Sequence, residues 1–182
     1  AVEKLQTYDQ MQILRFYDEL TDTQKAALLD EIDKIDFNDI KPSELSNSED
    51  DIHPMGMMKL EEINKKRDHF KKIGLENIKA GKSAALLLAG GQGTRLGIDG
   101  PKGTLNVGIN RELYIFECLI NNLMDVVHEA GTWIPLFIMT SVKNDEATRK
   151  FFAEKNYFGY DKDHIYFFIQ DMAPATDFDG KV

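Results

Sequence analysis

Residues 86–103 read LLLAGGQGTRLGIDGPKG, and this stretch decides both the expected fold class and the expected position of a binding site. It starts within a continuous apolar run, residues 84–89, which is typical of a strand covered on both faces. Four glycines follow within residues 90–97, where the backbone can turn sharply and approach a phosphate group closely. In open α/β sheets, ligands bind in the loops that follow such strands.

The chain after this loop alternates between helical and strand patterns. A helix is expected through residues 113–127 and should end by Gly131, followed by a strand at residues 134–139. A second helix is expected over residues 146–155 and a third strand over residues 165–169. This order predicts an α/β domain over residues 82–182, Rossmann-like, with a mainly parallel sheet.

Residues 1–81 are expected to form a helical N-terminal segment. Residues 13–20 have helical spacing, and Thr21 and Gln24 are placed for a capping box at the start of the next helix. Residues 41–54, KPSELSNSEDDIHP, are polar and acidic, which indicates a linker. A further helix from Leu60 is expected to end near Gly74, before a short helical piece that reaches Gly81.

Composition excludes several classes of protein. The net charge of −9 and the pI near 4.9 argue against a nucleic-acid-binding surface, and the apolar runs are too short to span a membrane. The single cysteine fits a cytoplasmic protein, and the four histidines lack metal-ligand spacing, so no metal site is expected in this segment. Because the chain begins without Met and stops just after a strand and a turn, we expect it to be an N-terminal fragment.

Three common glycine-loop motifs do not fit residues 90–103. The dinucleotide fingerprint and the protein-kinase loop both need a glycine where Leu96 stands. Walker A needs Gly-Lys-Ser/Thr, whereas Lys102 lies between Pro101 and Gly103. A plain structural turn remains an alternative. The guanidinium fork of Arg95 and the ammonium of Lys102 nevertheless favour a loop that binds phosphate.

The loop resembles the signature of the uridine-diphosphate-sugar pyrophosphorylases, G-x-G-T-R-hydrophobic-G-x-x-x-P-K. The matching residues are Gly91, Gly93, Thr94, Arg95, Leu96, Gly97, Pro101 and Lys102. The segments LRFYDELTDTQKAALLDEI, PLFIMTS and FDGK are similar to the same family, most closely to its UDP-N-acetylhexosamine branch. The resemblance implies a nucleotide-diphosphosugar transferase core of the GT-A-like type, incomplete at its C-terminus in this chain.

The resemblance also implies an activity, namely uridylyl transfer from UTP to a sugar 1-phosphate with release of pyrophosphate. N-acetylhexosamine 1-phosphate is the expected acceptor. A UTP–glucose-1-phosphate uridylyltransferase and a non-catalytic nucleotide-binding module remain alternatives. The implied partners are UTP or UDP-sugar, the sugar 1-phosphate and the remainder of the catalytic domain, and the isolated chain is expected to be inactive.

The family's residue roles carry over to matching positions only. Arg95 and Lys102 are the implied catalytic residues. The implied nucleotide-binding residues are Ala89, Gly90, Gly91, Gly93, Thr94 and Gln170. Magnesium is the implied cofactor, with its ligands and the sugar-binding segment expected downstream of residue 182. Residues 108–112, GINRE, depart from the family's pattern, which leaves the local loop shape open.

Overall fold

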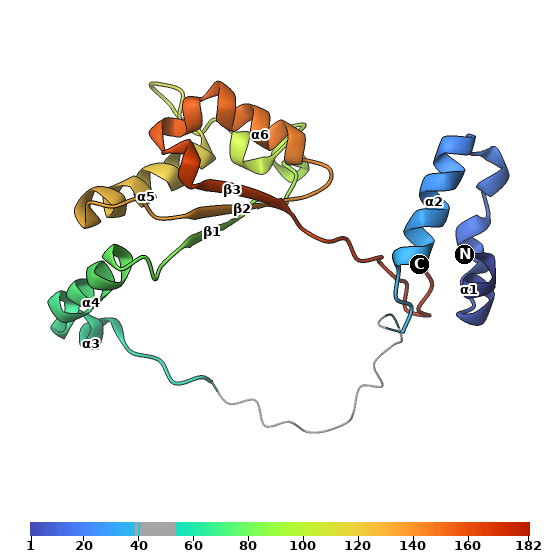
Figure 1. Ribbon diagram of the computed structural model, residues 1–182, viewed down its shortest axis with the longest axis horizontal. Coiled ribbons are helices and arrows are strands. Elements are labelled where there is room, and N and C mark those ends of the chain that lie inside the picture. Colours follow the sequence, from blue (N-terminus) through green and yellow to red (C-terminus); the bar gives the residue numbers. More distant parts are fainter. Residues whose placement is uncertain (39, 41–53) are drawn as a thin grey trace. The chain divides into compact units, whose positions relative to one another are not determined.

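The structure is a computed structural model that describes residues 1–38, 40 and 54–182. It divides the chain into two compact units, each described separately below (Figure 1). One unit comprises Ala1–Met55 and Met172–Val182, and the other comprises Gly56–Asp171. The predicted linker lies outside the described residues, apart from Pro54. These units do not coincide with the predicted division near residue 81.

The unit Gly56–Asp171 contains a three-stranded parallel sheet. Its strands are β1 (Ala85–Leu88), β2 (Leu136–Thr140) and β3 (Ile165–Ile169), in the order β1-β2-β3. Ala85 is in register with Leu136, which is in register with Ile165. Parallel neighbours need crossover connections, and α5 (Ile115–Ala130) and α6 (Asp145–Glu154) provide them. The predicted parallel α/β fold is confirmed.

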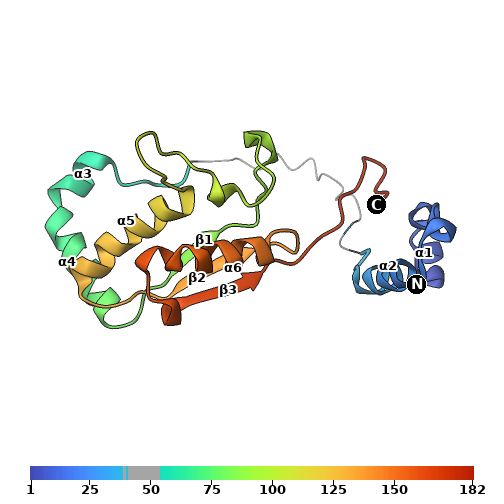
Figure 2. The same ribbon diagram turned by 90° about the horizontal axis from the view of Figure 1, so that it is seen from above.

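Helices α5 and α6 lie on the same face of the sheet (Figure 2). The core between them and the strands consists of apolar side chains that are at most 9% exposed: Phe116, Ile120, Val127, Ile134, Leu136, Ile138, Phe152, Tyr160 and Ile165. Burying one such side chain contributes about 1.5–3 kcal/mol. Helix α5 ends at Gly131, whose φ of 68° is left-handed, as expected for a glycine C-cap.

The opposite face of the sheet is open in the described residues. Strand β1 was predicted to be covered on both faces, but Leu86 and Leu88 are 61% and 67% exposed. Side chains alternate along a strand, and both crossover helices lie on the other face, so every second residue is left uncovered. Large side chains continue this open face on the other strands, at Phe137, Tyr166 and Phe168.

Within the unit Gly56–Asp171, two helices precede the sheet, α3 (Leu60–Lys65) and α4 (Arg67–Lys79). The prediction that a helix ends near Gly74 is wrong, because α4 continues through this residue. No atom lies within 4 Å of the position that a Cβ would take there. A glycine in a helix costs only about 0.5–1 kcal/mol relative to alanine, which is too little to end this helix. A turn at Asn156–Gly159, whose four residues all have positive φ, and a short 3₁₀ helix at Lys162–His164 lead into β3.

The other unit begins with α1 (Val2–Thr7), two 3₁₀ turns (Met11–Leu14 and Tyr17–Glu19) and α2 (Asp22–Lys34). The predicted capping box is confirmed: the Gln24 N–H donates to Thr21 Oγ1, and the Thr21 N–H donates to Gln24 Oε1. The expected helix over residues 13–20 is only partly correct, since this stretch forms 3₁₀ turns and not an α-helix. Leu5, Ile32 and Phe37 form the core.

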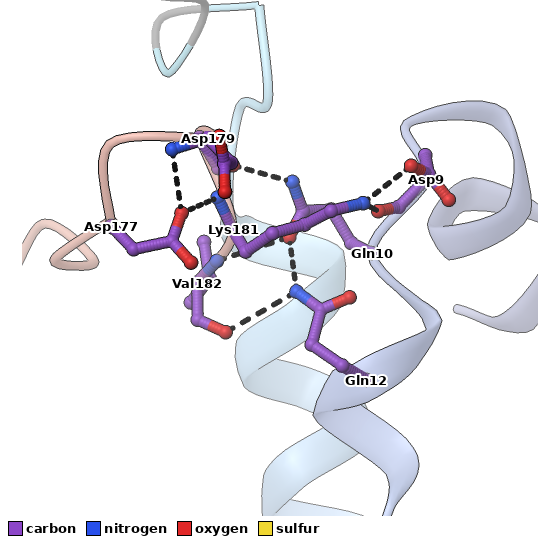
Figure 3. A network of polar contacts seen from close by, with 8 residues as sticks. Asp9, Gln10, Gln12, Asp177, Asp179, Lys181 and Val182 are labelled. Atoms are coloured by element: carbon purple, nitrogen blue, oxygen red, sulfur yellow. Dashed lines mark hydrogen bonds and ion pairs between the residues drawn. The ribbon is translucent and has the colours of Figure 1, made fainter.

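Residues 177–182 pack against α1 and the turn that follows it within this unit (Figure 3). Gln10 is only 5% exposed; its Nε2 donates to the Gly180 carbonyl at 2.8 Å. Its Oε1 accepts from the Val182 N–H at 3.1 Å. The Lys181 ammonium pairs with the Asp9 carboxylate. The FDGK segment is therefore held by the N-terminal helices.

Candidate functional site

The candidate site lies where the three parallel strands end. The Ala89 N–H donates to the Met139 carbonyl at 2.7 Å, and the Gln170 N–H donates to the Thr140 carbonyl at 2.8 Å. These two bonds continue the sheet by one residue beyond β1 and β3. They bring the beginning of the glycine loop and Gln170 to the same edge of the sheet.

The glycine loop is closed by its own backbone. The Gly93 N–H donates to the Gly100 carbonyl at 2.8 Å, and the Lys102 N–H donates to the Gly91 carbonyl at 3.2 Å. Between these bonds the chain forms a 3₁₀ turn, Thr94–Leu96, and reverses at Gly97, whose φ is 73°. A second 3₁₀ turn, Lys102–Thr104, follows the loop.

Two glycines in this region are required by packing. A Cβ on Gly93 would collide with the Ile98 side chain, and a Cβ on Gly103 would collide with the Phe116 ring of α5. Both glycines are buried. They allow the loop to fold tightly against itself and against α5, which fixes the position of the segment between them.

Several backbone donors of the loop are unpaired. The N–H groups of Gly90, Gly91, Gln92, Thr94 and Arg95 have no hydrogen-bond acceptor in the part of the chain that the structure describes. Closely spaced N–H groups of this kind form a concave site for anions. Gly91, Thr94 and Arg95 are exposed, so their N–H groups can bind water until a ligand replaces it.

The two basic side chains of the loop are also available to a ligand. Arg95 and Lys102 are both exposed, and neither has an ion-pair partner among residues 1–38, 40 and 54–182. On a chain with a net charge of −9, these two cations provide local positive charge beside the unpaired N–H groups. The combination suits a polyanionic ligand.

Gly90 and Gln170 are brought into contact across the end of β2. A Cβ on Gly90 would lie 2.5 Å from Oε1 of Gln170, so only glycine leaves this side chain in place. Gln170 is half-buried, and its amide presents both a donor and an acceptor beside the loop. Gly90 and Gln170, each of which the resemblance implies to bind the nucleotide, therefore lie next to each other.

Polar side chains at the end of β2 were not predicted from the sequence. Asp145 Oδ1 accepts from Thr140 Oγ1 at 2.6 Å, and Asp145 Oδ2 accepts from Arg149 Nε at 2.8 Å. Burial raises the pKa of Asp145, but the hydrogen bonds from Arg149 and Thr140 outweigh it and hold the pKa below the ordinary 3.8. The carboxylate is thus ionised and committed to the fold. In the sequence, the four-residue spacing from Asp145 to Arg149 could have indicated this ion pair.

Metal ligands and membrane spans can be examined within the same residues. In the described part of the chain, no group of three or more His, Cys, Asp or Glu side chains could hold a metal ion. None of the described helices combines the length and the hydropathy that a membrane crossing requires.

A parallel α/β sheet with a glycine loop of unpaired N–H groups at its carboxyl edge is typical of domains that bind phosphorylated ligands. Comparison with known families makes this assignment specific. The family described as UTP–glucose-1-phosphate uridylyltransferase matches residues 19–182, so the chain belongs to this family.

Individual relatives agree with this assignment. The chain is 36% identical to the UDP-N-acetylglucosamine pyrophosphorylase of Saccharomyces cerevisiae, over 98% of this chain and 39% of the relative. It is 34% identical to UDP-N-acetylglucosamine diphosphorylase 1 of Arabidopsis thaliana, over 99% of this chain and 40% of the relative. The chain thus spans about 40% of the length of these curated relatives.

A solved structure agrees as well. The chain is similar to the crystal structure of the uridine diphosphate N-acetylglucosamine pyrophosphorylase from Trypanosoma brucei in complex with an inhibitor, with a TM-score of 0.70 and 27% identity. This match covers all of the chain and 40% of the solved one. The predicted family and the predicted fold are therefore confirmed, whereas the roles of the individual site residues stay predictions.

Proposed function

We propose that the full-length protein is a uridylyltransferase, which forms UDP-sugar and pyrophosphate from UTP and a sugar 1-phosphate. The observation that carries the proposal is the loop at residues 90–102 of a chain from this family. There, five unpaired backbone N–H groups lie in one loop with two exposed and unpaired cations. N-acetylhexosamine 1-phosphate is the favoured acceptor, because the relatives named above act on N-acetylglucosamine by name.

The proposed reaction needs charge stabilisation more than proton transfer. A phosphate oxygen of the sugar 1-phosphate attacks the α-phosphorus of UTP, and pyrophosphate leaves in line. The attacking oxygen is already ionised at neutral pH, so no general base is required. The barrier arises from bringing two polyanions together while negative charge moves onto the leaving group.

The chain's own residues would meet this need at three places. The unpaired N–H groups from Gly90 to Arg95 would bind phosphate oxygens. Arg95 would hold the leaving pyrophosphate with its guanidinium fork, and Lys102 would neutralise charge that develops in the transition state. Because the loop is closed by its own hydrogen bonds, these donors are preorganised before the substrate arrives.

Recognition of the base is proposed for Gln170. Its amide can donate to and accept from the polar edge of uracil. Gly90 would leave room for this, since a side chain at residue 90 would displace the amide. Ala89, which holds the end of β1 against β2, would support the same pocket.

Magnesium is the cofactor that this proposal implies. The described residues contain no group of three His, Cys, Asp or Glu side chains that could hold a metal ion, and the resemblance implies that the magnesium ligands lie downstream. The protein ligands of the ion are therefore proposed to lie outside these residues. No step above is assigned to the ion.

The remainder of the catalytic domain is the partner proposed for the open face of the sheet. Leu86, Leu88, Phe137, Tyr166 and Phe168 form an apolar surface on three neighbouring strands. Domains of this class cover such a surface with a second layer. We also propose a cytoplasmic location, which the single cysteine of the sequence fits.

Two alternatives remain, and one of them has specific support. The description of the matched family favours glucose 1-phosphate as acceptor, in which case the protein is a UTP–glucose-1-phosphate uridylyltransferase. A non-catalytic nucleotide-binding module would keep the loop without turnover. Arg95 and Lys102 argue against this second alternative, because the chain keeps both residues of the signature that the resemblance implies to be catalytic.

A pyrophosphate-release assay on the full-length protein separates these possibilities. UTP and magnesium are supplied with either N-acetylglucosamine 1-phosphate or glucose 1-phosphate. Faster turnover with the first acceptor is expected, and faster turnover with the second would establish the alternative acceptor. No turnover with either acceptor, together with tight UTP binding, would establish the non-catalytic module.

Two further measurements complement this assay. Gln170→Ala should reduce the preference for UTP over ATP and GTP in competition binding, and unchanged selectivity would remove Gln170 from the site. The isolated 182-residue chain is expected to be silent in the assay, because the described residues provide neither a metal site nor an identified acceptor site.

A further inference from the structure

Asn144 connects the beginning of α6 to the glycine loop. It is 1% exposed and lies directly before the first residue of the helix. Its Nδ2 donates to the Ala89 carbonyl at 2.9 Å and to the Gly91 carbonyl at 3.2 Å. A single buried amide therefore binds the carbonyl groups on both sides of Gly90.

The orientation of this amide is fixed by a third hydrogen bond. Asn144 Oδ1 accepts from the Ser141 N–H at 2.9 Å. If the amide were turned by 180°, its oxygen would face two carbonyl oxygens and its nitrogen would face an N–H group. Only the observed orientation pairs every group.

Asn144 also departs from the usual behaviour of asparagine at this position. An asparagine before a helix normally accepts a hydrogen bond from one of the first helical N–H groups. Here its side chain makes no such bond with α6. The helix thus forgoes a side-chain cap, and the amide serves the glycine loop instead.

The two hydrogen bonds determine where the loop's donors point. A peptide group is planar and trans, so the N–H of one residue points away from the carbonyl of the residue before it. Since the Ala89 and Gly91 carbonyls face Asn144, the Gly90 and Gln92 N–H groups are turned away from it. These two belong to the five that have no acceptor within the described residues.

The same amide is coupled to Lys102. The Gly91 carbonyl accepts from Asn144 and also from the Lys102 N–H at 3.2 Å. Loss of the Asn144 amide would release one of the two donors that hold this carbonyl. The backbone of Lys102 would then lose part of its support.

From this geometry we infer that Asn144 is a positioning residue for nucleotide binding: it orients the peptide groups around Gly90 so that their N–H groups face the phosphates of UTP. The inference rests on the proposed function. It adds a residue that touches no substrate and acts only through the loop.

Asn144→Ser in the full-length protein tests this role against a purely structural one. Serine caps helices as well as asparagine does, but its short hydroxyl cannot donate to both carbonyls. The expected result is a protein that still folds, with a melting temperature a few degrees lower because the Ala89 and Gly91 carbonyls lose a donor, and with UTP binding weakened about tenfold and kcat lowered. Asn144→Asp, which keeps the acceptor for Ser141 and loses both donors, should weaken binding at least as much.

Thr148→Val is the matched control on the same helix. Thr148 is fully buried, and its hydroxyl has no hydrogen-bond partner in the described residues, so valine fills the same space. UTP binding by this variant should stay within about twofold of the wild type. All variants are titrated with UTP by calorimetry below their melting temperatures, and kcat and KM are measured separately.

The outcomes separate the inference from the proposed function. A wild-type protein that does not bind UTP contradicts the proposed function, and the inference falls with it. If the wild type binds UTP and folded Asn144→Ser and Asn144→Asp bind it equally well, the inference alone is overturned. If Asn144→Asp does not fold, the serine variant decides by itself.

Discussion

Two glycine-containing turns of this chain use their backbone groups in opposite ways. In the turn at residues 177–182, five N–H groups are paired: those of Asp177, Asp179, Gly180, Lys181 and Val182. Its lysine is paired with Asp9 (Figure 3). In the loop at residues 90–102, five N–H groups and two basic side chains have no partner among the described residues.

The difference separates a structural turn from a binding loop. A buried or half-buried turn gains stability when its donors are satisfied within the fold. A loop that leaves its donors unpaired forgoes that stability and keeps the donors for a ligand. Both turns belong to segments that resemble the family, so resemblance alone does not distinguish their roles, whereas the hydrogen bonding does.

Removing the Lys102 ammonium from the loop should produce the largest effect on turnover. In the full-length protein, Lys102→Ala should lower kcat by about 10²–10³-fold, or about 3–4 kcal/mol, and change KM for UTP much less. Steady-state pyrophosphate release measures this. Lys102→Arg should rescue only in part, because the guanidinium differs in reach and shape.

The matched control for Lys102 is Lys162→Ala. Lys162 is exposed and precedes β3, at the opposite edge of the sheet from the site. The kcat of the Lys162→Ala variant should equal that of the wild type. Near-wild-type turnover in Lys102→Ala would remove the catalytic role from this lysine.

A substitution that weakens the turn at residues 177–182 should lower the stability of the protein and leave UTP binding unchanged. Gln10→Ala leaves the Gly180 carbonyl and the Val182 N–H without a partner, which should lower the free energy of unfolding by about 1–3 kcal/mol. Urea denaturation with and without UTP measures both properties. A variant of unchanged stability, or one with weakened UTP binding, would contradict the assignment of this turn.

A single methyl group at the site should weaken binding without unfolding the protein. Gly90→Ala places a Cβ 2.5 Å from Gln170 Oε1, and we expect UTP to bind about tenfold more weakly, or about 1.4 kcal/mol. The control is Gly74→Ala in α4, which meets no atom and should stabilise the fold by about 0.5–1 kcal/mol. Equal affinities of the two variants in calorimetric titration would refute the proposed role of the Gly90–Gln170 contact in UTP binding.

The smallest effect is expected from replacing Lys181, the lysine of the turn at residues 177–182. Lys181→Ala removes an ion pair whose carboxylate partner, Asp9, is 93% exposed. Such pairs contribute about 0.2–1 kcal/mol to stability, and less at high salt. Turnover should be unchanged. A loss of activity comparable with that of Lys102→Ala would show that the two turns do not differ in function.

Much of the fold could be predicted from local sequence patterns. The apolar run at residues 84–89, the helix closed by Gly131 and the capping box at Thr21 each depend on neighbouring residues only. The helix end expected near Gly74 was wrong, because the small cost of one glycine is outweighed by the hydrogen bonds of α4. The exposure of Leu86 and Leu88 among the described residues was not predicted, since periodicity does not show which face a crossover helix occupies.

The candidate site could be predicted only in part, because only some of its features depend on neighbouring residues. The glycine loop with Arg95 and Lys102 is contiguous, so its residue types and spacing are visible in the sequence. The role of Asn144 depends on contacts with residues 53 and 55 positions earlier in the chain, and no local pattern reveals it. Whether a glycine-loop N–H is paired is likewise a property of the folded chain.

Hydrogen–deuterium exchange on the full-length protein, with and without UTP, tests most directly whether unpaired donors distinguish the two turns. Without UTP, peptides covering residues 90–95 should exchange rapidly, and those covering residues 177–182 should exchange slowly. With saturating UTP, exchange should slow in the first segment and stay unchanged in the second. Unchanged exchange at residues 90–95 in protein shown to be saturated with UTP would contradict the assignment of this loop as the phosphate-binding site.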